Sequence, residues 1–133
     1  MKIKCAMFFL VFYGVAYPQN PIVPISKKPL NLEFRESSWN KPLELKSVES
    51  VEKIFGKENT QAISRDIDFQ KQYVVVFFWR GSGGDKLNYT IAESNPEKIT
   101  FSIKRGFTRD LREHVQAFAL RNNVYWKVLN ESN

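Results

Sequence analysis

A chain of 133 residues suits a single domain, because natural domains cluster near about 100 to 150 residues. Its charged fraction of 26% is ordinary and its aromatic fraction of 14% is high, which excludes an intrinsically disordered chain. The net charge of +6 is modest and acidic residues are interspersed with the basic ones. We therefore expect no nucleic-acid partner, whereas weak attraction to anionic surfaces such as lipid head groups is compatible with this charge.

Residues 1–16 predict a cleavable export signal. Lys2 and Lys4 precede an apolar run over residues 5–15, which ends at the small residue Ala16. The run is shorter than the about 20 residues that cross a bilayer, and Pro18 follows it closely, so we expect no transmembrane anchor after signal removal. Cleavage after Ala16 would place the protein outside the cytoplasm, in a secreted or periplasmic location.

Loss of this signal would also change the chemistry of the chain. It removes Lys2, Lys4 and Cys5, which leaves 18 basic and 14 acidic residues and a net charge of +4. Because Cys5 is the only cysteine, the remaining chain has no thiolate nucleophile, disulfide or cysteine-based metal site. We predict no metal and no cofactor.

Residues 17–29 are predicted to form an extended tether without fixed structure, since they contain four prolines, at positions 18, 21, 24 and 29. Residues 30–133 are predicted to form a single β-rich domain. Its first expected strand covers residues 30–35, where Leu30, Leu32 and Phe34 alternate with polar residues.

A short helix is predicted after Ser47, whose hydroxyl can cap the first backbone N–H groups. Apolar residues recur at three- and four-residue spacing on one face, at Val48, Val51, Ile54 and Phe55. Gly56 stands where a C-cap residue is expected, so the helix should end there.

The second half of the chain predicts strands. Residues 73–79 form a continuous apolar run, typical of a central strand covered on both faces, and residues 81–85 form a glycine-rich turn. Residues 87–91 and 99–103 alternate as half-exposed strands, and residues 106–113 indicate a polar loop or a single helical turn. Residues 115–120 and 124–128 are predicted to pair as a hairpin across the two-residue connection 122–123. The expected fold class is α+β: an antiparallel β meander of about five strands with one short helix packed on it.

Asp68 and Phe69 are followed by the apolar residues 74–77, a glycine-rich turn, Tyr89 in the next strand and residues 124–128 as a closing strand. With this series of features, residues 47–129 resemble the carboxy-terminal domain of PrcB-type proteins. The resemblance implies an exported bacterial accessory factor that binds and stabilises a partner protease. Members of that family tend to carry a threonine-glycine-glycine-tyrosine turn, whereas here residues 85–88 separate the glycines from Tyr89. Residues 79–85 and 108–111 also resemble small secreted bacterial proteins.

An arginine-rich segment, residues 105–114, contains most of the candidate site residues: Arg105, Arg109, Asp110, Arg112 and His114. Arginine side chains bind carboxylate or phosphate in bidentate geometry, which would suit an anion pocket. The other interpretation is a solvated loop whose arginines pair with its own acidic residues, and this interpretation is favoured because such pairs are common on protein surfaces.

Two further candidates are Arg80, directly before the glycine-rich turn, and Asp85, the last residue of that turn. The segment differs from a phosphate-binding loop because a strand and not a helix follows it, so we expect an exposed contact loop beside the arginine-rich one. His114 is the only histidine and has no catalytic partner near it in sequence, which favours a structural role. Trp39, Trp79 and Trp126 are expected to lie mostly in the core, although they could form a sugar-stacking platform.

The sequence favours an exported, non-catalytic binding or accessory domain with another exported or envelope protein as its partner. The alternative is a small-ligand, anion-binding or hydrolytic site in residues 105–114. The second hypothesis requires a concave pocket that collects those side chains.

Overall fold

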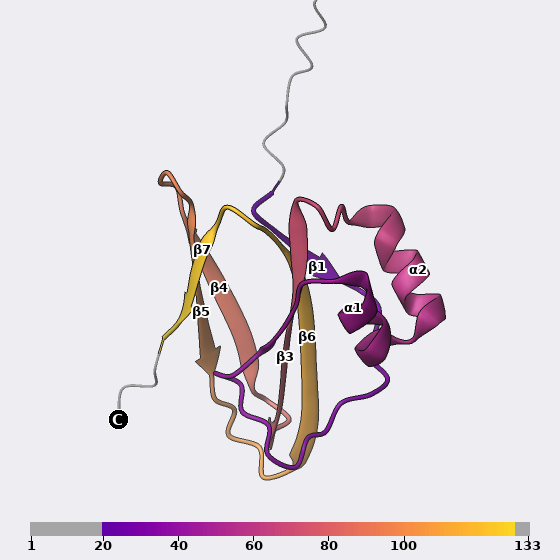
Figure 1. Ribbon diagram of the computed structural model, residues 1–133. Coiled ribbons are helices and arrows are strands. Elements are labelled where there is room, and N and C mark those ends of the chain that lie inside the picture. The colour runs from indigo at the N-terminus through magenta and orange to yellow at the C-terminus, as the bar shows by residue number, and fades with distance from the viewer. Residues whose placement is uncertain (1–19, 130–133) are drawn as a thin grey trace, which may run out of the picture.

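The computed structural model describes residues 20–129, which form seven strands and two helices in three layers (Figure 1). The export signal predicted over residues 1–16, with Cys5, lies outside the described residues. The four-stranded sheet has the order β1-β6-β3-β2 and contains β1 (Ile22–Ile25), β2 (Leu43–Leu45), β3 (Gln72–Ser82) and β6 (Leu111–Arg121). The three-stranded sheet has the order β4-β5-β7 and contains β4 (Lys86–Ala92), β5 (Lys98–Lys104) and β7 (Tyr125–Val128). The helices are α1 (Val48–Phe55) and α2 (Lys57–Asp66).

Strand β3 is the centre of the fold, and its side chains alternate between two cores. Residues 73, 75, 77 and 79 point into the core between the sheets, whereas residues 74, 76 and 78 point into the core under the helices. Every residue from Tyr73 to Trp79 is buried. The prediction of a central strand covered on both faces is confirmed.

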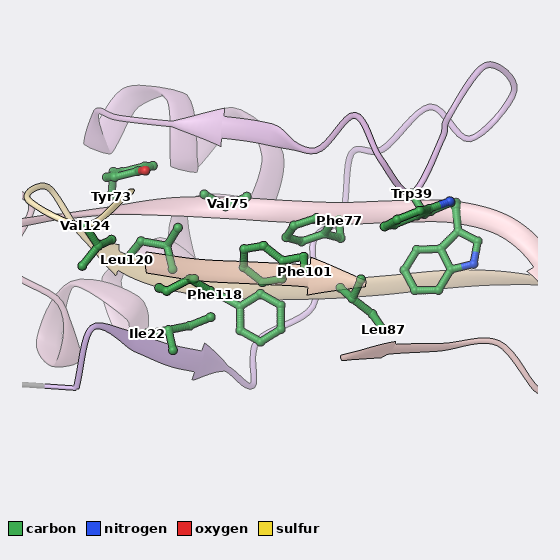
Figure 2. Close-up of a cluster of buried hydrophobic side chains, with 12 residues drawn as sticks. Ile22, Trp39, Tyr73, Val75, Phe77, Leu87, Phe101, Phe118, Leu120 and Val124 are labelled. Atoms are coloured by element: carbon green, nitrogen blue, oxygen red, sulfur yellow. The ribbon is translucent and has the colours of Figure 1, made fainter. Parts of the chain in front are cut away.

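The core between the two sheets is rich in aromatic residues (Figure 2). Phe101 of β5 lies at its centre, with its ring centroid 4.5 Å from that of Phe77 and 5.7 Å from that of Phe118. Trp39 and Trp79 are buried, and Trp126 packs against the same core with its Nε1 donating to the Tyr73 hydroxyl at 2.7 Å. The tryptophans therefore lie mainly in the core.

Helix α1 begins and ends where the sequence predicts. Its N-cap Ser47 accepts a hydrogen bond from the Ser50 backbone N–H, and the Ser47 N–H donates to the Ser50 hydroxyl, both at 3.1 Å. Gly56 follows the helix with a φ of +83°, a conformation that favours glycine. The helix buries Val51 and Phe55 against the four-stranded sheet.

Replacing Ser47 with alanine is expected to lower the free energy of unfolding by about 1 kcal/mol, because the substitution removes the acceptor that satisfies a free helix N–H. Urea unfolding followed by circular dichroism measures the change. Ser64→Ala is the matched control: Ser64 is exposed inside α2, where alanine is the better helix former. Equal losses in the two variants would contradict the capping role.

The strand topology differs from the predicted five-stranded meander. Strands β3 and β4 lie in different sheets, and β7 pairs in parallel with β5 instead of forming a hairpin with β6. The side chain of Asn122 donates to the Gln70 carbonyl and its backbone N–H donates to the Lys71 carbonyl. These bonds tie the turn to the start of β3, and Val124 then enters the core between the sheets. The chain therefore crosses to the other sheet at this point.

Two predictions near the amino terminus are wrong. Residues 30–35 form no strand, because the backbone N–H groups of Leu30 and Asn31 both donate to the carbonyl of Ile54 in α1. Within the predicted tether of residues 17–29, Ile22–Ile25 form strand β1, which pairs with β6 and buries Ile22. Tertiary pairing thus overrides the local proline signal.

Two smaller corrections concern α2 and β6. Helix α2 was not predicted, since only Thr60 and Ile63 are buried in it and its apolar stripe is correspondingly short. Strand β6 begins at Leu111, so the predicted polar loop of residues 106–113 ends three residues earlier than expected. Among the described residues, neither helix is long and apolar enough to cross a membrane.

Candidate functional site

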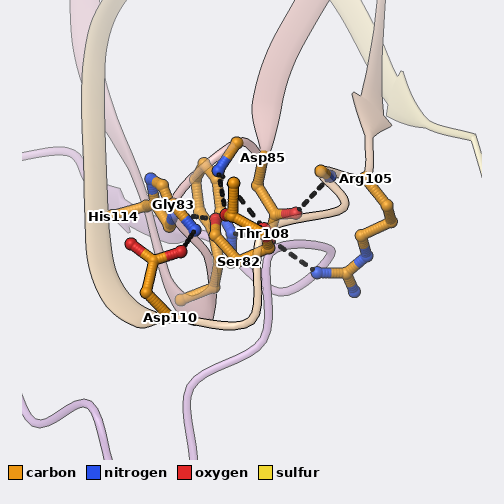
Figure 3. Close-up of polar contacts among 10 residues, drawn as sticks. Ser82, Gly83, Asp85, Arg105, Thr108, Asp110 and His114 are labelled. Carbon is orange, nitrogen blue, oxygen red and sulfur yellow. Dashed lines mark hydrogen bonds and ion pairs between the residues drawn. The ribbon is translucent and has the colours of Figure 1, made fainter.

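Two loops meet at one end of the sandwich, the connection between β3 and β4 and the connection between β5 and β6 (Figure 3). The carboxylate of Asp85 joins them, although its side chain is only 1% exposed. It accepts hydrogen bonds from Trp79 Nε1 at 3.1 Å, from Arg105 Nη1 at 3.2 Å and from the Gly106 backbone N–H at 2.8 Å. The loop between β5 and β6 is therefore anchored to a buried charge.

Asp85 is held in its ionised form by these donors. Burial by itself raises the pKa of the carboxyl, but hydrogen bonds from Gly106, Trp79 and Arg105, with the positive charge of Arg105, outweigh burial and lower the pKa below its usual 3.8. The group is therefore a charged structural anchor at neutral pH.

A second set of contacts fixes the far half of the same loop. The hydroxyls of Thr108 and Ser82 lie 2.6 Å apart, and the Gly84 N–H donates to Thr108 at 3.2 Å. The Asp110 carboxylate accepts from the Gly83 N–H at 3.2 Å and from Arg112 Nε at 2.8 Å. Hydrogen bonds from Thr108, Arg112 and Gly83 hold the pKa of Asp110 well below its usual range.

Glycine at position 106, in the loop between β5 and β6, is needed for close approach of the two loop backbones. A Cβ atom on Gly106 would lie 2.4 Å from the carbonyl carbon of Gly84 and 2.8 Å from the Asp85 nitrogen, both of them backbone atoms. Only glycine fits there without moving the loops. The two loops lie side by side, as the sequence indicates.

His114 has the contacts of a structural histidine. Its Nε2 lies 2.7 Å from the Ser82 carbonyl oxygen, and its ring stacks on Trp79 with centroids 4.8 Å apart and planes at 14°. Trp79 and His114 are directly opposite each other in the ladder between β3 and β6, which places both rings on one face of the sheet.

A groove of about 980 Å³ runs beside β6 and the irregular segment that follows β1. Its polar walls carry four basic residues, Lys27, Lys28, Arg35 and Arg80, and two acidic residues, Glu33 and Glu113. Its apolar lining includes Leu30, Leu32, Phe34, Val115 and Phe118. The groove is thus apolar in part and has an excess of positive charge.

The seven candidate site residues do not gather in one pocket. Asp85 and Arg105 form one ion pair, and Asp110 and Arg112 form another. Arg80 and His114 line the groove instead, and Arg109 is exposed on the loop. Within residues 20–129, no group of three or more histidine, cysteine, aspartate or glutamate side chains could hold a metal ion.

Comparisons with protein-family models, curated proteins and solved structures find no match to this chain. The features from which a function can be inferred are therefore the anchored loop, the groove and the strand edge beside the groove.

That strand edge is a feature the sequence analysis missed. Strand β1 pairs only with residues 117–120 of β6, so residues 111–116 have a neighbouring strand on the β3 side alone among the described residues. The edge depends on where β1 stops, and no local signal in β6 reveals it. The basic pair Lys27 and Lys28, which follows β1 after Ser26, was the available hint of a charged groove.

Proposed function

We propose that this protein is a non-catalytic binding domain that receives an extended segment of a partner protein along the open edge of β6. The observation that carries the proposal is the coincidence of this edge, residues 111–116, with the groove of about 980 Å³. Addition of a strand to an exposed sheet edge is a common mode of peptide recognition. The export signal predicted for residues 1–16 and the resemblance to PrcB-type accessory factors support the same role outside the cytoplasm.

The backbone N–H and C=O groups of the open edge point in the direction that pairing with another strand requires. The Arg121 N–H donates to the Pro21 carbonyl, so the odd-numbered residues of β6 point their N–H and C=O groups toward the β1 side. The register of β6 with β3 is continuous from Ser82↔Leu111 to Gln72↔Arg121, so this alternation holds along the whole strand. Leu111, Glu113 and Val115 therefore offer their backbone groups to an incoming strand.

The outer edge of β1 is less suitable for pairing. Pro24 is opposite Phe118, whose backbone groups point toward β3, so the missing N–H of Pro24 costs no hydrogen bond to β6. That missing N–H lies on the outer side of β1 instead, where proline discourages further pairing. Strand addition is thus directed to residues 111–116.

The charges of the groove select an acidic segment. Four basic residues against two acidic ones give its walls a net charge of +2. Arg112 and Glu113 on the edge itself disfavour indiscriminate pairing between sheets, whereas the apolar groove residues can accept alternate side chains of an extended peptide. A partner segment in which acidic and apolar residues alternate fits both features.

A catalytic role for residues 105–114 has less support from the geometry. His114 is engaged with the Ser82 carbonyl and covered by Trp79, and Asp110 is bonded to Gly83 and Arg112. These side chains are used to hold the loop and the end of the sheet. A binding domain is therefore the function we infer.

The test peptide is a short one in which valine and glutamate alternate. Replacing Glu113 with proline is expected to weaken its binding by about tenfold, because the substitution removes one outward N–H. The hydrogen bond that this N–H would donate to a peptide carbonyl is worth about 1.4 kcal/mol. Proline is tolerated at this position because the lost N–H faces away from β3. Fluorescence anisotropy of the labelled peptide measures the effect, and the thermal melting profile checks that the variant is folded.

Glu113→Ala is the matched control, since it removes the same carboxylate but keeps the backbone N–H. It should bind the acidic peptide at least as tightly as the wild-type protein. The lysine counterpart of the peptide should bind more weakly to all three proteins. Equal binding of the acidic peptide by the alanine variant and the proline variant would refute strand addition at this edge.

A further inference from the structure

The loop between β5 and β6 exposes a phenylalanine that no core requires. The side chain of Phe107 is 98% exposed, and Leu111 at the end of the same loop is 64% exposed. Figure 1 shows this connection at the end of the molecule opposite the start of β1. An apolar ring held in water is unfavourable, and such residues commonly mark a contact surface.

Hydrogen bonds hold the loop on both sides of Phe107. On one side of Phe107, the Gly106 N–H donates to the buried Asp85 carboxylate. On the other side, the Thr108 hydroxyl bonds to Ser82 and accepts from the Gly84 N–H (Figure 3). Binding through Phe107 therefore requires little further ordering of the loop, which favours association.

The segments next to Phe107 carry an excess of positive charge. Residues 85–86 and 104–112 contain five basic residues, Lys86, Lys104, Arg105, Arg109 and Arg112, and two acidic residues, Asp85 and Asp110, a net charge of +3. Lys86 and Lys104 are directly opposite each other in the ladder between β4 and β5. Like charges in opposite positions are destabilising, so an anionic partner would relieve this repulsion.

We propose that this loop docks on the surface of an anionic lipid bilayer, with Phe107 and Leu111 at the level of the head groups and the surrounding cations against lipid phosphates. Arg105 and Arg109 lie two residues to either side of Phe107 in sequence, so basic side chains flank the apolar tip. A broad anionic surface with an apolar layer below it matches this arrangement. A soluble phosphate would use the cations but would leave Phe107 in water.

Phe107 and Arg109 do not line the groove, so replacing them tests lipid binding separately from the peptide site, although Leu111 belongs to both surfaces. The test uses residues 17–133, which contain every described helix, strand and core residue, because the apolar residues 5–15 would bind lipid by themselves. Sedimentation with vesicles of equal parts phosphatidylglycerol and phosphatidylcholine measures binding. Vesicles of phosphatidylcholine alone provide the neutral surface.

The wild-type protein should bind the anionic vesicles and not the neutral ones, and salt at about 1 M should abolish binding because the Debye length falls to about 3 Å. Phe107→Ala should weaken binding about tenfold, through loss of the buried ring. Arg109→Gln should weaken it about fivefold, since each basic side chain near such a surface contributes about that factor.

Tyr125→Ala is the control for aromatic exposure. Tyr125 is 56% exposed and lies opposite Lys98, at the other end of β5 from the loop, so its loss should leave vesicle binding unchanged. Equal binding to neutral and anionic vesicles, or equal binding by the wild-type protein and Phe107→Ala, would overturn the proposal. Absence of vesicle binding by the wild-type protein would overturn it too, and would direct the search to a protein partner for Phe107.

Discussion

Replacing Phe101 with alanine is expected to lower the free energy of unfolding by about 4 kcal/mol, which is the typical cost of removing a buried phenylalanine ring. Phe101 is fully buried in β5, the central strand of the three-stranded sheet. Its ring contacts Phe77 and Phe118 of the opposite sheet. The substitution therefore leaves a cavity between the two sheets at the place where they are joined most closely by aromatic contacts.

Urea unfolding followed by tryptophan fluorescence measures this loss. Phe107→Ala is the matched control, because it makes the same chemical change at a ring that is 98% exposed, and its effect should be within about 0.5 kcal/mol. Comparison of the two variants thus separates the effect of removing a packed ring from the effect of removing an exposed one. A similar loss of unfolding free energy in both variants would show that the Phe101 ring is not packed in the core between the sheets.

The local elements of the fold were predictable from the sequence. The serine cap and Gly56 mark both ends of α1, and the continuous apolar run over residues 73–79 marks a strand with two covered faces. These signals lie within the segment that they describe. The helix and the strand that they predict therefore depend little on the rest of the chain.

The pairing of the strands was not predictable in the same way. Residues 122–124 have the composition of a tight hairpin, but bonds from Asn122 to the start of β3 and burial of Val124 send the chain to the other sheet. Likewise, the alternating residues 30–35 contribute half-buried side chains to the core under the helices while their backbone bonds to α1. An alternating pattern reports burial, and it does not report the hydrogen-bonding partner.

The candidate site was also predictable only in its local features. Selection by residue type found the two loops that meet at the end of the sandwich, because glycine, aspartate and arginine are concentrated there. It could not show that Asp85 is a buried anchor or that Phe107 is left outside, since both outcomes depend on contacts between segments about 20 residues apart. The open edge of β6 depends on an even more distant pairing, with β1.

Replacing Asp85 with alanine is expected to lower the free energy of unfolding by about 3 kcal/mol. The substitution leaves the buried N–H of Trp79 and the partly buried N–H of Gly106 without their acceptor, and an unsatisfied buried donor costs about 1 to 3 kcal/mol. Arg105 is half exposed, so its charge can return to water and adds less. Urea unfolding at neutral pH measures the change.

Asp110→Ala is the control for removal of a carboxylate from the same pair of loops. Asp110 lies on the exposed side of the loop, so its loss should cost less stability than the loss of Asp85. Equal costs would show that the loops are held by their surface charges and not by the buried anchor.

The acid sensitivity of the protein should depend on the same anchor. Because the pKa of Asp85 is lower in the folded protein than its usual 3.8, its stabilising contribution is fully present above that value. The contribution is lost as the pH falls from about 3.8 through the lower folded-state pKa, where the carboxylate takes up a proton and no longer accepts charge-assisted hydrogen bonds. Asp85→Asn lacks this titration, so the difference in unfolding free energy between wild-type protein and variant should shrink over that range. A difference that stays constant with pH would mean that Asp85 acts through its shape alone, and that the loop carrying Phe107 is held without a buried charge.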